Sequence, residues 1–146
     1  MKNRNMNHKD NWVTPPDLYH ILDLEFNFDF DPCPLHSKFD GLIIDWGQRN
    51  FVNSPYSRKL KEAFINKAFE ESNKGKLCVM LLPVSTSSKI FHEVIYPNAE
   101  IRFIRGRVKF AGVNTYGDYV DFDNNCGPMH DSMIVIFRGI EYDNHK

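Results

Sequence analysis

One run of apolar residues constrains the fold of this 146-residue chain more than any other feature. The segment Leu77-Cys78-Val79-Met80-Leu81-Leu82 contains no charged side chain and ends at Pro83. A continuous apolar run of this length is typical of a strand that is buried on both faces. Such strands lie at the centre of α/β sheets, so the sequence predicts a sheet covered by helices on both sides.

Helix and strand patterns alternate on both sides of this run. A first helix is expected to begin after Thr14, whose hydroxyl would be its N-cap, and the clearest helix has Leu60, Phe64 and Ala68 on one apolar face. Because helices and strands alternate, we expect an α/β fold with a small, mostly parallel Rossmann-like sheet and flanking helices. The other elements are expected as strands at 26–31, 42–44, 51–52, 101–104 and 133–137, and a helix at 89–95 ended by Pro97.

The length and the net charge of the chain exclude several classes of protein. A chain of 146 residues with 42% hydrophobic residues fits one domain, which we place at 12–140 between tails at 1–11 and 141–146. The formal charge of −1 gives no global basic field, so a polyanion would have to bind a local patch. No apolar signal segment or membrane span is visible, and three cysteines form no disulfide framework. The expected protein is therefore soluble and cytoplasmic.

Turn residues directly after strands are the first candidates for a binding site, because open α/β sheets bind ligands beyond the carboxyl ends of their strands. Three such turns occur here. They are Asp31-Pro32-Cys33-Pro34, Asn53-Ser54-Pro55-Tyr56 and Pro83-Val84-Ser85-Thr86.

The second turn is the most informative of the three, because it combines the side-chain amide of Asn53, a backbone restricted by Pro55 and the aromatic ring of Tyr56. It resembles the Asn/Asp-Pro-Pro-Tyr motif of amino-group DNA methyltransferases. The exocyclic N6 of adenine is a poor nucleophile because its lone pair is delocalised into the ring. The Asn53 side-chain oxygen and the Ser54 carbonyl could each accept one N6 hydrogen, and Tyr56 could stack on the base.

Further blocks extend this similarity over nearly the whole chain, from Trp12 to Phe137. Together they resemble the phage-type DNA N-6-adenine methyltransferase family. The blocks are Asp10-Asn11-Trp12-Val13-Thr14-Pro15, Phe28-Asp29-Phe30-Asp31-Pro32-Cys33, Asp40-Gly41-Leu42 with Asp45-Trp46, Asn53 to Ser57, Leu81-Leu82-Pro83 and Gly106-Arg107-Val108-Lys109-Phe110.

The resemblance implies an S-adenosylmethionine-dependent enzyme that methylates the exocyclic amine of a flipped adenine in DNA, in the bacterial host cytoplasm if the chain is phage-encoded. It implies methyl transfer at Asn53, Ser54, Pro55 and Tyr56. It also implies cofactor binding by Trp12, Thr14, Pro15, Asp31, Pro32 and Cys33.

The chain departs from the family pattern at two points, and the roles of two residues remain open. The family usually has proline where this chain has Ser54, and no Gly-x-Gly loop follows the first strand. Asp31 could hydrogen-bond the cofactor or cap its own turn. Trp12 could pack on the adenosyl group or cover the edge of the core.

Local cationic clusters are the expected DNA contacts. These are Arg58 and Lys59 in one cluster, and Arg105, Arg107 and Lys109 in the other, whereas Lys61 is expected on a solvated helix face. The long segment 111–131 could be a lid, a target-recognition loop or a solvated β-hairpin.

Other functions remain open from the residues alone. A catalytically silent DNA-binding protein of the same fold is the main alternative, and a homodimer would help so small a chain bind duplex DNA. A metal-dependent nuclease could use Asp29, Asp31, His130 and Asp131, but no metal site is predicted, because the pairs Cys33/His36 and Cys126/His130 are loosely spaced.

Overall fold

The structure is a computed structural model that describes residues 12–35, 37–113, 119–121 and 130–139. The proposed tails and most of the segment between residues 114 and 129 lie outside the described residues. The elements are β1 (Trp12–Val13), α1 (Pro16–Phe26), β2 (Arg49–Asn53), α2 (Arg58–Ser72), β3 (Leu77–Pro83), the π-helical turn η1 (Phe91–Ile95), α3 (Tyr96–Asn98), β4 (Glu100–Phe103), β5 (Ala111–Val113), β6 (Tyr119–Val120) and β7 (Ser132–Phe137).

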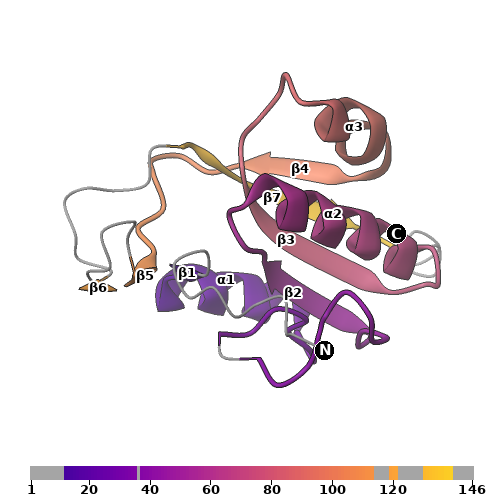
Figure 1. Cartoon of the computed structure of the whole chain (residues 1–146), viewed down its shortest axis with the longest axis horizontal. Coiled ribbons are helices and arrows are strands. Elements are labelled where there is room, and N and C mark those ends of the chain that lie inside the picture. The colour runs from indigo at the N-terminus through magenta and orange to yellow at the C-terminus, as the bar shows by residue number, and fades with distance from the viewer. Residues whose placement is uncertain (1–11, 36, 114–118, 122–129, 140–146) are drawn as a thin grey trace.

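A four-stranded sheet in the order β2-β3-β7-β4 forms the centre of the molecule (Figure 1). The predicted apolar run is β3, and its first six residues are buried, as expected. β2 and β3 pair in parallel, but β7 is antiparallel to both β3 and β4. The α/β class is thus confirmed, while the sheet is mixed rather than mostly parallel. β2, β3 and β4 still point in one direction, because two antiparallel steps separate β3 from β4.

Two apolar cores lie on the two faces of this sheet. Alternate β3 residues contribute to each core, with Val79 on the α1 side and Met80 on the α2 side. Figure 1 shows α2 lying over β3 and β7. A second, antiparallel sheet in the order β1-β5-β6 lies beyond the main sheet. Its β5–β6 pairing agrees with the hairpin alternative for the segment 111–131 at the described residues 111–113 and 119–120.

The sequence predicted α1 correctly but misassigned its two ends. The N-cap is Pro15 rather than Thr14, and it makes no side-chain cap because proline has no side-chain acceptor. The Thr14 hydroxyl accepts a hydrogen bond from Asn53. The Phe26–Phe30 alternation was expected to be a strand, yet Phe26 ends the helix. Asn27, with φ of 52°, closes it in the left-handed conformation, leaving a single bridge from Phe30 to Asn50.

Two further boundaries differ from the sequence expectations. The predicted strand at 42–44 is a turn, in which Asp40 accepts hydrogen bonds from the backbone N–H groups of Leu42 and Ile43. The helix expected to end before Pro97 continues to Asn98, because Pro97 occupies the first turn of α3, where its missing N–H costs nothing.

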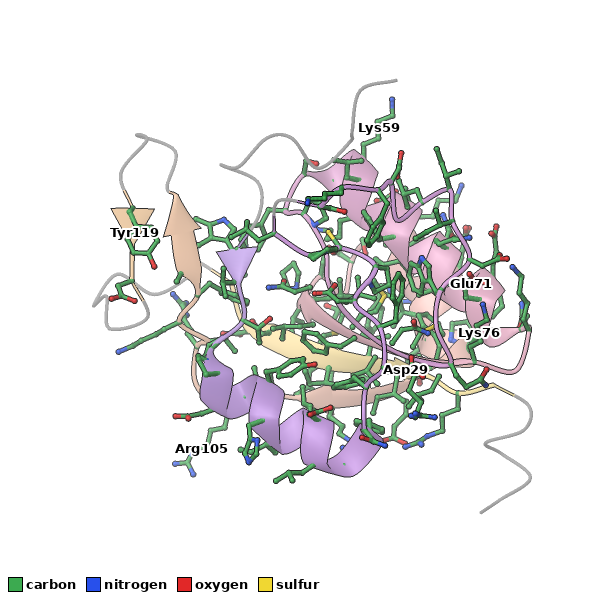
Figure 2. All side chains as sticks on the ribbon, turned by 90° about the horizontal axis from the view of Figure 1, so that it is seen from below. Asp29, Lys59, Glu71, Lys76, Arg105 and Tyr119 are labelled. Atoms are coloured by element: carbon green, nitrogen blue, oxygen red, sulfur yellow. The ribbon has the colours of Figure 1, made fainter. Side chains whose placement is uncertain are left out.

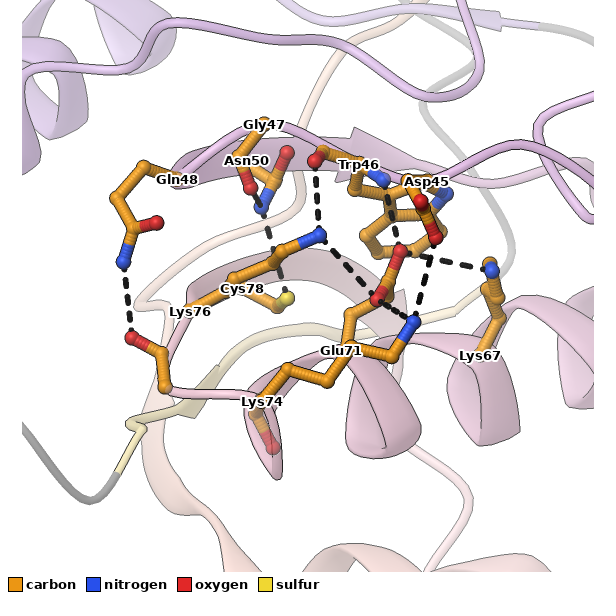
Figure 3. Close-up of polar contacts among 12 residues, drawn as sticks. Asp45, Trp46, Gly47, Gln48, Asn50, Lys67, Glu71, Lys74, Lys76 and Cys78 are labelled. Carbon is orange, nitrogen blue, oxygen red and sulfur yellow. Dashed lines mark hydrogen bonds and ion pairs between the residues drawn. The ribbon is translucent and has the colours of Figure 1, made fainter.

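A buried carboxylate, Glu71, connects the end of α2 to the loop that precedes β2 (Figure 3). The Glu71 side chain is 1% exposed, and its oxygens lie 2.8–3.5 Å from the ammonium groups of Lys67, Lys74 and Lys76. The backbone N–H of Trp46 donates to Glu71 Oε1 over 2.7 Å. Burial alone would raise the pKa of Glu71, but these donors and cations outweigh it and lower the pKa to about 2.

This cluster supports the predicted cofactor turn through two further contacts. The Trp46 indole N–H donates to the Gly41 carbonyl over 2.7 Å. A Cβ on Gly41 would lie 1.9 Å from the Pro32 carbonyl oxygen, so the loop can approach the Asp31-Pro32-Cys33 turn this closely only with glycine. The position of that turn therefore depends on the buried carboxylate.

We expect Glu71→Gln to lower the free energy of unfolding at pH 7 by about 3 kcal/mol, since it leaves three ammonium groups without their shared partner. The folded pKa of about 2 lies below the ordinary value of 4.5, so the stabilisation is complete above pH 4.5 and is lost as the pH falls toward 2. Urea unfolding at pH 7 and pH 3 measures this. Glu70→Gln, at an exposed neighbouring position, is the control. Equal losses in both variants would contradict the account.

Candidate active site

The turns predicted to carry the site meet at one edge of the main sheet. Asn53, the last residue of β2, lies opposite Leu81 in the parallel ladder with β3. The segment through Phe30 also runs parallel to β2 through its bridge to Asn50, so Asp31 emerges at the same edge. The fold thus brings together the ends of strands that are 22 positions apart in the sequence, Asp31 and Asn53.

The Asn53 side chain is held in a defined orientation. Its Nδ2 donates to the Trp12 carbonyl over 2.6 Å and to Thr14 Oγ1 over 3.1 Å. Both donor hydrogens of the amide are therefore used by the segment that precedes α1. Within the described part of the chain, Asn53 Oδ1 accepts no hydrogen bond, so it is the acceptor that remains for another group.

A cavity of about 250 Å³ lies on one side of Asn53. Aromatic rings and one carboxylate dominate its wall, and the exposed side chains of Val13, Tyr19 and Leu35 stand at its mouth. Among the residues predicted to bind the cofactor, Trp12, Thr14, Asp31 and Cys33 line it, whereas Pro15 and Pro32 do not. The remaining lining residues are Pro16, Phe51 and Asn53 itself.

Sequence reasoning missed two aromatic residues of this wall. Tyr19 lies three positions after Pro16 on α1, and its ring packs edge-on against Phe51 with a centroid distance of 5.2 Å. The helical spacing of Pro16 and Tyr19 was the available signal, because residues three apart share one helix face. The sequence gives no indication that Phe51 lines a cavity, since a buried strand residue elsewhere in the sheet would show the same pattern.

Asp31 has a perturbed acidity at this position. More than a third of the residue is accessible to solvent, yet protein atoms crowd its carboxylate from the cavity side. This desolvation raises the pKa to about 6, although the Cys33 N–H, which donates to Asp31 Oδ1 over 2.9 Å, lowers it in part. Its charge therefore changes just below neutral pH.

A shallow hollow of about 10 Å³ lies on the other side of Asn53. The turn residues Ser54, Pro55 and Tyr56 line it. The Tyr56 ring contacts Trp12 and Phe110 edge-on, with centroid distances of 6.1 and 6.0 Å. Burial raises the pKa of Tyr56 to about 12, so its phenol stays protonated at neutral pH. Asn53 thus separates the hollow from the larger cavity.

Comparisons with known proteins show the family to which the chain belongs. The sequence profile described as DNA N-6-adenine-methyltransferase (Dam) matches residues 2–145. The chain belongs to this methyltransferase family. It is also 31% identical over 145 residues to the DNA N-6-adenine-methyltransferase of Haemophilus phage HP1 (strain HP1c1), covering 89% of this chain and 79% of the relative. No solved structure matches it.

Membership of the DNA N-6-adenine-methyltransferase family confirms the resemblance and the class of enzyme expected from the sequence blocks. No helix among the described residues is long and apolar enough to span a membrane. The described residues also contain no cluster of three or more potential metal ligands, and Asp29, assigned to a nuclease in the alternative, pairs with Arg49 at 3.4 Å.

The cations expected to contact DNA lie in two places on this family member. Arg105, Arg107 and Lys109 follow β4 and are exposed, and Figure 2 shows the Arg105 side chain pointing away from the body of the molecule. Val108 between them is buried, so the alternation directs the cations outward. Arg107 lies 3.8 Å from Asp131. The other cluster, at the start of α2, points elsewhere, and Lys59 extends into solvent.

We expect Asp31→Asn to raise the melting temperature at pH 7.5 but not at pH 3.5. The folded pKa of about 6 exceeds the ordinary 3.8, so the folded state carries the cost of an ionised carboxylate above that range. Below pH 3.8 the group is protonated in both states, and the substitution changes little. Calorimetric scans at the two pH values measure the effect. An equal shift at both would contradict this origin.

Proposed function

We propose that this protein transfers a methyl group from S-adenosylmethionine to the exocyclic N6 of an adenine in DNA. The observation that carries the proposal is the position of Asn53. Its side chain lies between a cavity and a hollow, and its amide is oriented so that only Oδ1 remains to accept a hydrogen bond.

The arrangement of strands supports a small Rossmann-like methyltransferase fold. β2, β3 and β4 share one direction, and the candidate groups lie beyond their carboxyl ends. This is where open α/β sheets bind ligands. The single reversed strand, β7, lies between β3 and β4, and its first residue, Ser132, lines the hollow at that edge.

The larger cavity fits the adenosyl part of the proposed cofactor. Trp12, Tyr19 and Phe51 offer ring faces and edges to a purine, and Asp31 offers a carboxylate to ribose hydroxyls. A volume of about 250 Å³ is slightly below the usual 300–1,000 Å³ of ligand cavities, so the open mouth would leave part of the ligand in solvent. When bound, S-adenosylmethionine would supply an electrophilic methyl group on a sulfonium.

The residues of the turn would prepare the acceptor nitrogen. Asn53 Oδ1 and the Ser54 carbonyl each accept one N6 hydrogen, which draws the nitrogen toward tetrahedral geometry and localises its lone pair. The tethers to Trp12 and Thr14 prevent the Asn53 amide from rotating. Because the acceptors are fixed before the base arrives, no reorganisation is needed when charge develops.

Base entry requires a local opening. A hollow of about 10 Å³ cannot hold a purine, so the Tyr56 and Phe110 rings must separate to admit it. Stacking on an aromatic ring supplies roughly 1–3 kcal/mol per base, which offsets much of the few kcal/mol of unstacking. Ser54 and Pro55, which precede Tyr56 in the turn, are buried.

Incubation with methyl-tritiated S-adenosylmethionine and unmethylated DNA, followed by nucleoside analysis, tests the function. The expected product is N6-methyladenine. DNA binding without any labelled nucleoside would favour the catalytically silent alternative. Label in cytosine would contradict the adenine assignment.

Asn53→Ala is expected to reduce methyl transfer by roughly 10²–10³-fold, the range for loss of one positioned hydrogen-bonding group at a reacting centre. Affinity for S-adenosylhomocysteine should fall by a smaller factor, because the substitution removes the tethers to Trp12 and Thr14 but leaves the rings and the carboxylate of the cavity in place. Single-turnover kinetics and calorimetry measure the two quantities. Thr14→Val removes only one of the two tethers and should have a smaller effect. Wild-type turnover in Asn53→Ala would overturn the mechanism.

Tyr56→Phe is expected to keep most of the activity, whereas Tyr56→Ala should lose it together with base capture. The reason is that stacking needs the ring, and the phenol stays protonated and takes no part as a base. Fluorescence of 2-aminopurine at the target position reports base extrusion in each variant. Loss of activity in Tyr56→Phe would show that the hydroxyl is required.

A further inference from the structure

A second and larger cavity, of about 370 Å³, lies between α2 and residues 85–91. We call it the α2 cavity. Its floor is apolar and includes Ile65, Leu82, Phe91 and Met133, all of them buried. Polar and charged side chains form its rim. The cavity lies on the α2 face of the sheet, so it is distinct from the one beside Asp31.

The rim of the α2 cavity is cationic. Arg58, Lys61 and Lys89 lie on the rim with one carboxylate, Glu62, and Lys89 pairs at 4.0 Å with Glu93, which does not line the cavity. Arg58 Nε lies 3.1 Å from Glu62, but the arginine side chain is 80% exposed, and such surface pairs are weak and readily exchanged. Lys61 is half-buried and forms no ion pair with any described residue. The rim therefore has room for an anion.

Hydroxyl groups complete the rim. Ser88 caps the following helical turn, since it accepts from the Phe91 N–H over 3.4 Å and donates to the Ser85 carbonyl over 2.8 Å. The hydroxyls of Ser85 and Ser87 make no hydrogen bond to any other described residue. They remain as donors beside the cations. This serine turn follows β3 directly, at the third strand end that the sequence singled out.

The α2 cavity adjoins the methyl-transfer turn. Leu82 and Pro83 line both the α2 cavity and the hollow beside Asn53. Arg58, at the start of α2, follows Asn53 by five positions in the sequence. A strand that delivers its adenine to the turn therefore passes the rim of this cavity.

We propose that the α2 cavity binds one nucleotide of the substrate DNA next to the methylated adenine, with its phosphate on the Lys61 and Arg58 side of the rim and its sugar and base against the apolar floor. The choice of DNA as the ligand rests on the function proposed above. A lone phosphate would leave the apolar floor unused, and an apolar peptide would leave Lys61 without a partner. A nucleotide satisfies both surfaces.

Fluorescence anisotropy with a labelled single-stranded oligonucleotide tests the proposal. Lys61→Ala is expected to weaken binding about fivefold and to lower the salt slope by about one. Lys38→Ala removes the same charge from an exposed position that neither lines the α2 cavity nor belongs to the predicted DNA contacts, and it should weaken binding less than twofold. Equal losses in the two variants would overturn the proposal, because only net charge would then matter.

A cavity-filling variant on the rim tests occupancy of the cavity separately from the charge. Ser87→Trp is expected to weaken binding by about tenfold or more, because the indole occupies the space of the nucleotide. Ser87→Ala removes one hydroxyl donor but fills no space, so it should weaken binding less than threefold. Circular dichroism confirms that each variant is folded. Wild-type affinity in folded Ser87→Trp would refute occupancy of the cavity. The assay uses no methyl donor, so its result stands even if the chain proves catalytically silent.

Discussion

The site depends on one pair of hydrogen bonds, from the Asn53 amide to Trp12 and Thr14, which lie 41 and 39 positions earlier in the chain. These bonds close one wall of the cavity beside Asp31 and leave a single oriented acceptor facing outward. They also join the small antiparallel sheet to the large one, because Trp12 belongs to β1. The same contact therefore shapes the proposed cofactor site and orients the proposed catalytic oxygen.

A second interaction supports the site from the opposite end of the sheet. Buried Glu71 holds Trp46, Trp46 holds the Gly41 carbonyl, and Gly41 packs on the Pro32 carbonyl. The turn that carries Asp31 thus has a rigid support. The ionised Asp31 carboxylate lowers the stability of the folded state, since its desolvation disfavours the charge. Destabilising groups concentrate at functional sites, which agrees with its place in the cavity.

The sequence revealed features that depend on local pattern and missed those that depend on partners distant in the chain. The apolar run predicted β3, and the spacing of Leu60, Phe64 and Ala68 predicted α2, because period and burial are local properties. The direction of β7 was not encoded in its own residues. Thr14 was predicted to be an N-cap, because no residue close to it in the sequence indicated that its hydroxyl accepts a hydrogen bond from Asn53. Likewise, only the helix orientation distinguishes Lys61 from Lys59.

The central claim is that Asn53 separates a methyl-donor cavity from the base. A crystal structure of the protein with S-adenosylhomocysteine tests it most directly. The account predicts that the adenosyl group lies in the cavity lined by Trp12, Asp31 and Asn53, with the thioether sulfur directed toward Asn53. Density for the adenosyl group in the α2 cavity, with the space beside Asp31 vacant, would contradict it.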